Sequence, residues 1–133
     1  MKTLSYTIEL NELDPVGYVH HPHYFVICEK VREQLLQTHY ADYASLKNKD
    51  IALVVAKIDA EYSLPLTAGP IEVAITIHSH SSKMLTLTHE MKRSGYKAFS
   101  ANIVFVSVNY STGKTCPLPS EVTSFIDAIH GAL

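Results

Sequence analysis

The segment NELDPVGYVHHPHYFVICEKVREQLL, residues 11–36, changes from a polar, turn-forming loop into a helix with an apolar stripe. From Pro22 to about His39 apolar side chains recur at helical spacing, namely Tyr24, Ile27, Cys28, Val31 and Leu35. Polar side chains fill the other positions, namely Glu29, Lys30, Arg32, Glu33 and Gln37. Pro22 suits the first turn of a helix, where its missing N–H costs nothing. The pattern predicts one long helix that buries its apolar side against a sheet.

Strand patterns lie on both sides of this helix. Residues 3–10 alternate, with Leu4, Tyr6, Ile8 and Leu10 expected on one face. Four more strand patterns follow at 52–63, 71–78, 85–91 and 96–110, and Ser94-Gly95 supplies a hairpin turn between the last two. Because residues 98–110 are apolar on both faces, we expect that strand to be central. The order predicts an α+β fold in which an antiparallel sheet of about five strands wraps around one long helix.

Two shorter helices complete the predicted elements. One spans Tyr40 to Lys47, and the other is capped by Ser120 and carries an apolar stripe of Val122, Phe125, Ile126 and Ile129. The 133 residues suit a single domain, 1–133, with no linker or internal repeat.

Composition excludes several classes of partner. A formal charge of -2, with acidic and basic side chains scattered along the chain, argues against nucleic acid and against an anionic membrane surface. No apolar run is long enough to span a bilayer and the start of the chain lacks a leader pattern, so a cytoplasmic protein is expected. Cys28 and Cys116 have no CxxC spacing, which argues against a disulfide framework.

The loop and helix start, DPVGYVHHPHY at 14–24, resemble the signature of the 4-hydroxybenzoyl-CoA thioesterase (YbgC-like) family of hotdog-fold proteins. The resemblance covers most of the chain, including the helix with Glu29 and the ending VSVNYSTGKTCPLP. One departure is His23, which stands where many relatives carry asparagine. The resemblance implies a hotdog fold, acyl-CoA thioesterase activity, a homodimer or homotetramer with its pocket between subunits, and no cofactor apart from the coenzyme A of the substrate.

Thioester hydrolysis needs a group that attacks the carbonyl or activates water, and a positive dipole where the oxyanion develops. A helix N-terminus offers unpaired N–H groups, and the resemblance assigns the polarising N–H to His21. Asp14 precedes His21 by seven residues, and Gly17 gives the loop its backbone freedom. Asp14 is therefore the candidate general base or nucleophile, two roles that the residues leave open. The alternative for Asp14 is an Asp-Pro turn residue in a solvated loop.

Four other residues are candidates for substrate binding. Tyr24 opens the helix, while Glu29 either flanks the pocket or pairs with Lys30 or Arg32. Lys92 and Arg93, beside the Ser94-Gly95 turn, suit the phosphates of coenzyme A, although a solvated charge pair explains them equally well.

No metal site is expected. The HxxH spacing of His20 and His23 has no convincing further ligand on a shared element. His89 falls on the apolar side of its strand, as expected of a core or pocket histidine.

Three function classes fit the sequence. The first is hydrolysis of a thioester of coenzyme A or of an acyl-carrier protein. The second is a hotdog hydratase or dehydratase, which requires a histidine paired with a carboxylate on facing elements. The third is a non-catalytic protein that binds acyl thioesters.

Overall fold

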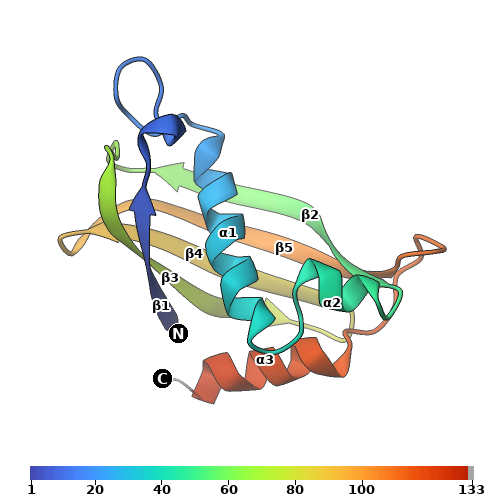
Figure 1. The fold of residues 1–133 in the computed structure, drawn as a ribbon. Coiled ribbons are helices and arrows are strands. Elements are labelled where there is room, and N and C mark those ends of the chain that lie inside the picture. Colours follow the sequence, from blue (N-terminus) through green and yellow to red (C-terminus); the bar gives the residue numbers. More distant parts are fainter. Residues whose placement is uncertain (132–133) are drawn as a thin grey trace.

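The computed structural model describes residues 1–131 as a five-stranded antiparallel sheet with helices on one of its faces (Figure 1). The strands are β1 (Lys2–Ile8), β2 (Ile51–Tyr62), β3 (Gly69–His80), β4 (Met84–Arg93) and β5 (Tyr96–Asn109). Their spatial order is β1-β3-β4-β5-β2. The helices are α1 (His23–Gln37), α2 (Tyr43–Lys47) and α3 (Ser120–Gly131), and a short 3-10 helix, η1 (Leu10–Glu12), follows β1. The predicted fold class is confirmed.

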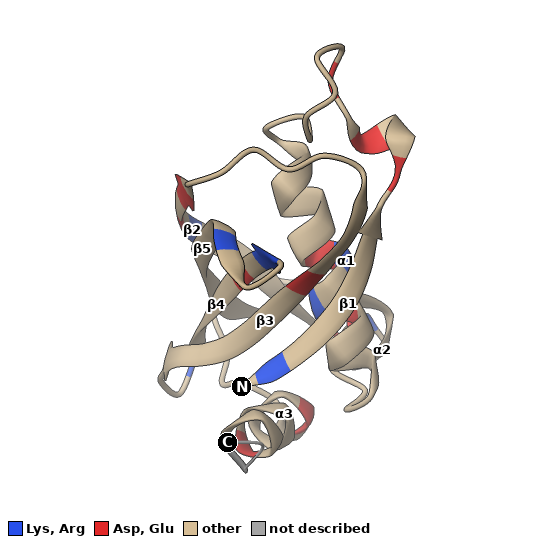
Figure 2. Ribbon diagram, turned by 90° about the vertical axis from the view of Figure 1, so that its left-hand side faces the viewer, with Lys and Arg blue, Asp and Glu red and all other residues tan. Residues whose placement is uncertain are grey.

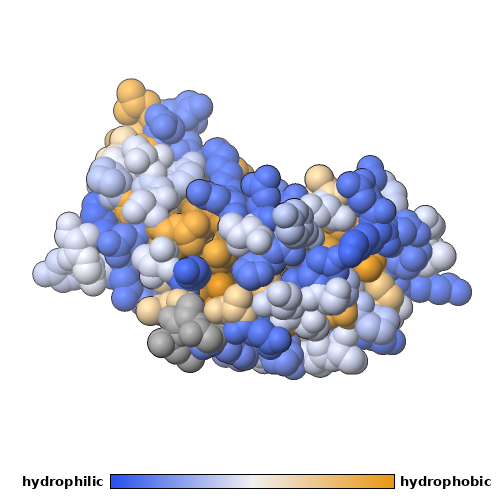
Figure 3. All heavy atoms as spheres, turned by 60° about the horizontal axis from the view of Figure 1, so that its bottom comes forward, coloured by the Kyte–Doolittle hydropathy of each residue, from blue (hydrophilic) through white to orange (hydrophobic). Residues whose placement is uncertain are grey.

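The core lies between the sheet and α1. The predicted stripe of α1 is buried, as are the four stripe residues of α3, which closes the lower end of the molecule in Figure 1. From below, in Figure 3, the surface is mostly polar and apolar atoms show near its middle. Within residues 1–131, no helix is both long and apolar enough to cross a bilayer.

Leu10 and Tyr40 both lie outside the elements predicted for them. Leu10 does not continue the apolar face of β1, because β1 ends at Ile8 and Leu10, in η1, is 79% exposed. The short second helix begins at Tyr43, since Tyr40 has a φ of 57° that a right-handed helix does not accommodate.

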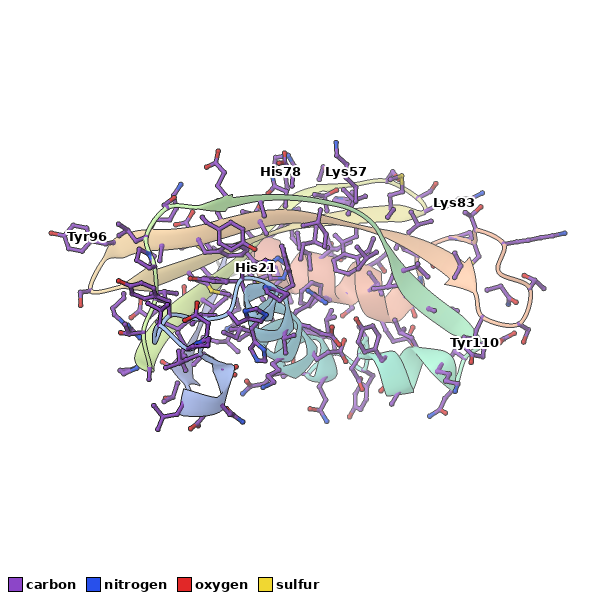
Figure 4. All side chains as sticks on the ribbon, turned by 90° about the horizontal axis from the view of Figure 1, so that it is seen from above. His21, Lys57, His78, Lys83, Tyr96 and Tyr110 are labelled. Atoms are coloured by element: carbon purple, nitrogen blue, oxygen red, sulfur yellow. The ribbon has the colours of Figure 1, made fainter. Side chains whose placement is uncertain are left out.

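The prediction that the last strand is central is wrong. β5 is an interior strand between β4 and β2, and β4 holds the central place. Buried and half-buried residues alternate along β5 from Phe99 to Val106. Its second apolar face is only half-buried because the helices cover the other side of the sheet (Figure 4).

Arg32 was expected on the polar side of α1, and this too is wrong. Its residue surface is only 4% exposed. One guanidinium nitrogen, Nη1, lies 3.3 Å from Nε2 of His89, and the guanidinium carbon lies 4.8 Å from the centre of the Phe105 ring. The long side chain therefore crosses into the core to reach β4 and β5.

Candidate active site

Residues 13–22 form a loop between η1 and α1 that projects beyond the sheet (Figure 1). Leu13 and Val19 pair as an isolated antiparallel bridge, and the backbone N–H of Asp14 donates to the carbonyl of Tyr18 at 2.7 Å. Gly17 has a φ of +100°, and a Cβ there would meet nothing within 4 Å. Backbone conformation, not lack of space, therefore calls for glycine at this turn.

The side chain of Asp14 organises this turn with one oxygen. Its Oδ1 accepts hydrogen bonds from the backbone N–H groups of Val16, Gly17 and Tyr18, at 2.9, 3.1 and 3.1 Å. Its Oδ2 has no hydrogen-bond partner among the residues that the structure describes. The alternative of a structural turn residue thus accounts for one carboxylate oxygen and leaves the other free for chemistry.

The start of α1 offers an unpaired donor. The His23 N–H donates to the carbonyl of His20 at 2.7 Å, whereas the His21 N–H finds no acceptor within residues 1–131. The carbonyl of His21 accepts a hydrogen bond of 2.9 Å from the hydroxyl of Tyr62, at the end of β2, which fixes the orientation of this backbone. His21 lies on the helix side of the sheet, at the start of α1 (Figure 4). A free N–H next to the positive end of a helix dipole is suited to bind a developing oxyanion.

An aromatic cluster lies under this helix start. The ring of Tyr24 is 5.1 Å from that of Tyr62 and 4.8 Å from that of Phe99, measured between centroids. The pKa of Tyr24 lies above its ordinary value, mainly because the side chain is buried. A hydrogen bond with the backbone of Leu66 opposes this rise, whereas the charges of Tyr62 and Asp14 add to it. Asp14 is thus within electrostatic range of the first turn of α1. Tyr24 is only 4% exposed, so it belongs to the floor of this region.

Glu29 and Lys30, which are adjacent on α1, do not form the ion pair that was predicted as one alternative for Glu29. Glu29 is exposed and forms no ion pair within the described chain, so the predicted pairing with Lys30 or Arg32 is not found. The Lys30 ammonium instead lies 3.8 Å from a carboxylate oxygen of Glu12. A role for Glu29 at the edge of a pocket stays a prediction.

Lys92 and Arg93 lie at the end of β4, beside an open hollow that continues to Ser94 and Gly95. Lys92 pairs with Glu90 at 3.2 Å. Arg93 donates to the carbonyls of Pro70 and Thr67 and to the Thr67 hydroxyl, so it braces the loop before β3. The Lys57 side chain points away from α1 on the opposite side of the sheet (Figure 4), which separates it from His21.

Two buried polar groups escaped the sequence-based predictions. Glu12, in η1, is 3% exposed and gathers Tyr6, His23 and Lys30 around its carboxylate. Figure 2 shows acidic residues on η1 and on the projecting loop, two segments that carry no lysine or arginine of their own. Arg32 and His89 form the second group. Burial, and then the charge of Arg32, lower the pKa of His89 to about 3. The one sequence signal for this pair was the placement of His89 on the apolar side of its strand.

Residues 8–126 match a family described as the thioesterase-like superfamily. The chain belongs to this superfamily. A 1,4-dihydroxy-2-naphthoyl-CoA hydrolase of Prochlorococcus marinus (strain NATL2A) is 26% identical over 132 aligned residues, which cover 92% of this chain and 85% of the relative. The predicted family and its thioester-hydrolase class are confirmed at the level of the superfamily.

Solved structures agree on the fold of this thioesterase-like chain. A 1,4-dihydroxy-2-naphthoyl-CoA thioesterase from Synechocystis superimposes with a TM-score of 0.87 at 19% identity, covering 96% of each chain. A gentisyl-coenzyme A thioesterase superimposes with a TM-score of 0.82 at 21% identity, covering 94% of this chain and 99% of the other. The hotdog architecture is therefore shared along nearly the whole length.

Proposed function

We propose that this thioesterase-like protein hydrolyses an acyl thioester of coenzyme A to the free acid and the thiol. The observation that carries the proposal is that one short loop holds both a free Asp14 oxygen and, where the loop enters α1, an unpaired His21 N–H. Water adds to the thioester carbonyl while Asp14 accepts its proton, and the His21 N–H binds the oxyanion. The C–S bond then breaks, and the thiolate takes the proton back from Asp14 and leaves as the thiol. In the nucleophilic alternative Asp14 attacks the carbonyl itself, the C–S bond breaks as the thiolate leaves, and water then hydrolyses the resulting anhydride to the free acid and the Asp14 carboxylate.

The acyl group is proposed to be aromatic. Tyr62, which is 50% exposed, stacks on the buried rings of Tyr24 and Phe99 beside His21, and offset or edge-on stacking on its open side would favour an aryl group by about 0.5–1.5 kcal/mol. The related proteins named above act on dihydroxynaphthoyl and gentisyl thioesters. For the carrier, Lys92 beside the β4–β5 turn provides a cation for the phosphates of coenzyme A, and an acyl-carrier protein is the alternative carrier.

The test is free thiol release from matched thioesters, read with a thiol-reactive dye. The panel contains benzoyl, hydroxybenzoyl, dihydroxybenzoyl and dihydroxynaphthoyl thioesters of coenzyme A, straight-chain acyl-CoAs, and one acyl-carrier-protein thioester. We expect turnover, with the hydroxyaryl thioesters giving the highest kcat/KM. Binding of these thioesters without thiol release by the purified oligomer would contradict hydrolysis and favour a non-catalytic binding protein.

A second candidate function has one observation in its favour. Glu12 and His23 form a histidine–carboxylate contact between η1 and α1, the type of pair that a hydratase or dehydratase requires. Against it, the His23 Nε2 atom is buried against Glu12. Loss of the conjugated absorbance of an enoyl-CoA, without thiol release, would favour this reaction over hydrolysis.

The proposed active unit is a homodimer joined along β2. β2 is an edge strand, so one side of its backbone has no partner within the described sheet. It also exposes Val54, Val55, Ile58 and Tyr62, by 42–50% of their surfaces. An exposed apolar edge invites pairing with another strand. Since Tyr62 also holds His21, a second copy added at β2 would border the catalytic loop.

Ile58→Lys is expected to convert this dimer into a folded monomer. Ile58 shares the α1-facing side of β2 with Tyr62, because side chains alternate along a strand, and a lysine there would introduce like charges across the two-fold axis. Light scattering after size-exclusion chromatography should show the wild type as a dimer or tetramer at micromolar concentration. Ile58→Val is the matched control and should keep the wild-type assembly. A monomeric, fully active wild type would refute the shared pocket.

A further inference from the structure

Glu12 is a buried carboxylate at the base of the catalytic loop, and charged groups are seldom buried without partners. Its Oε2 accepts a hydrogen bond of 2.8 Å from the Tyr6 hydroxyl and lies 3.0 Å from Nε2 of His23 and 3.8 Å from Nζ of Lys30. Its Oε1 accepts a hydrogen bond of 2.9 Å from the backbone N–H of Glu9. Both oxygens are thus engaged by the fold, which leaves neither available as a base.

Glu12 contacts the chain both before and after His21 and Pro22, once with its backbone carbonyl and once with its carboxylate. The backbone carbonyl of Glu12 accepts a hydrogen bond of 3.1 Å from the N–H of His20, the residue before His21. The carboxylate contacts His23, which is the first residue of α1. Glu12 therefore binds the residues on both sides of His21 and Pro22, namely His20 through its N–H and His23 through its ring.

The carboxylate of Glu12 is stabilised in its charged form. Burial by itself raises its pKa, but the hydrogen bonds from Glu9 and Tyr6 and the charges of Lys30 and His23 lower it below the ordinary value for glutamate. The contacts to His23 and Lys30 thus form around a charged group, which makes them stronger than contacts between neutral groups.

We infer that Glu12 is a positioning residue, which fixes the loop 13–22 against the first turn of α1 and so sets where Asp14 stands relative to the His21 N–H. The catalytic part of this inference rests on the proposed hydrolysis. The physical reason is geometric, because a displacement of about 1 Å between reacting groups can cost on the order of 10²-fold in rate. The Glu12 cluster (Tyr6, Glu12, His23 and Lys30) does not need to touch the substrate to have this effect.

Glu12→Gln tests the inference, since glutamine keeps the shape and one carbonyl oxygen but loses the charge. With the best thioester of the panel we expect kcat to fall between about 10- and 100-fold while KM stays within about twofold. Hydrogen exchange should become faster for the amides of residues 14–21 and stay unchanged in β3, β4 and β5. Asp127→Asn, which removes an exposed carboxylate of α3, is the matched control and should change neither quantity.

Substitutions of His23 provide a rescue test. His23→Asn keeps a polar side chain beside the Glu12 carboxylate and should keep kcat within about threefold of the wild type, whereas His23→Leu should reproduce the loss seen in Glu12→Gln. If the role of this contact were purely structural, the two His23 variants would have the same kcat. Hydrogen exchange that became faster by the same factor in the loop and throughout the sheet would also refute the positioning role.

The outcomes separate this inference from the proposed function. Unchanged loop exchange together with unchanged kcat in Glu12→Gln would overturn the positioning role. If the wild type hydrolysed no thioester of the panel but Glu12→Gln still loosened residues 14–21, the proposed function would fail and the hold of Glu12 on the loop would stand.

Discussion

Asp14→Asn is expected to lower kcat for thioester hydrolysis by about 10²–10⁴-fold, the usual contribution of a general base. The loop should keep its shape, because the amide oxygen of asparagine can accept the same hydrogen bonds from Val16, Gly17 and Tyr18 that Asp14 Oδ1 accepts. What disappears is the charge and basicity of the free oxygen. The melting temperature should therefore change little, and the measurement is steady-state thiol release at saturating thioester.

The matched control for this substitution is Glu29→Gln, on the exposed side of α1. It should cost much less than Asp14→Asn, because Glu29 is exposed on α1 and forms no hydrogen bond or ion pair of its side chain within residues 1–131. If Asp14→Asn kept near wild-type hydrolysis while Glu29→Gln abolished it, the helix carboxylate would be the base and the proposed mechanism would be wrong.

Stability should fall as the pH drops from 6.5 to 5, because of His89. Burial, and the charge of Arg32, lower its pKa in the folded protein to about 3, whereas an unfolded histidine titrates at about 6.5. Between pH 6.5 and pH 3, His89 therefore binds a proton in the unfolded chain but stays neutral in the folded protein. The free energy of unfolding should decrease by about 2 kcal/mol at pH 5, with full stability above pH 6.5. Urea unfolding at fixed protein concentration measures this change.

His89→Gln serves as the comparison for the pH effect, because glutamine can still accept a hydrogen bond from Arg32 but does not titrate. Its absolute stability can differ from the wild type, so the informative quantity is the change between pH 6.5 and pH 5, which should be close to zero. An equal decrease in both proteins would assign the acid sensitivity to another group. Glu12 does not interfere, since its lowered pKa places its own contribution below this range.

Local sequence patterns predicted the helices, strands and turns. The features that they did not predict, such as the strand order, depend on contacts between residues far apart in the sequence. The stripe of α1 and the turn at Ser94 and Gly95 follow from spacing and turn chemistry, which neighbouring residues determine. The central place of β4 could not be read in this way, because strand order depends on pairing between separate segments.

The site shows the same division. Asp14, Gly17 and His21 lie in one short segment, the loop 13–22 that leads into α1, and their catalytic roles stay predictions. Burial of Arg32 depends on His89, 57 residues away, so helical spacing alone assigned it to the surface. Glu12 was missed for a similar reason, since its partners come from β1 and α1.

The irregular pairing of β2 has a consequence for solubility. Between Val55 and Lys57 the register of β2 against β5 shifts, which marks a bulge in the edge strand. Long, flat apolar edges promote stacking of strands into aggregates, and a bulge interrupts the even ladder that such stacking requires. The charged side chains of Lys57, Asp59 and Glu61 follow directly after it along the same strand. The edge is therefore apolar enough to attract a strand of complementary shape, yet too uneven and too charged for indiscriminate growth into fibres.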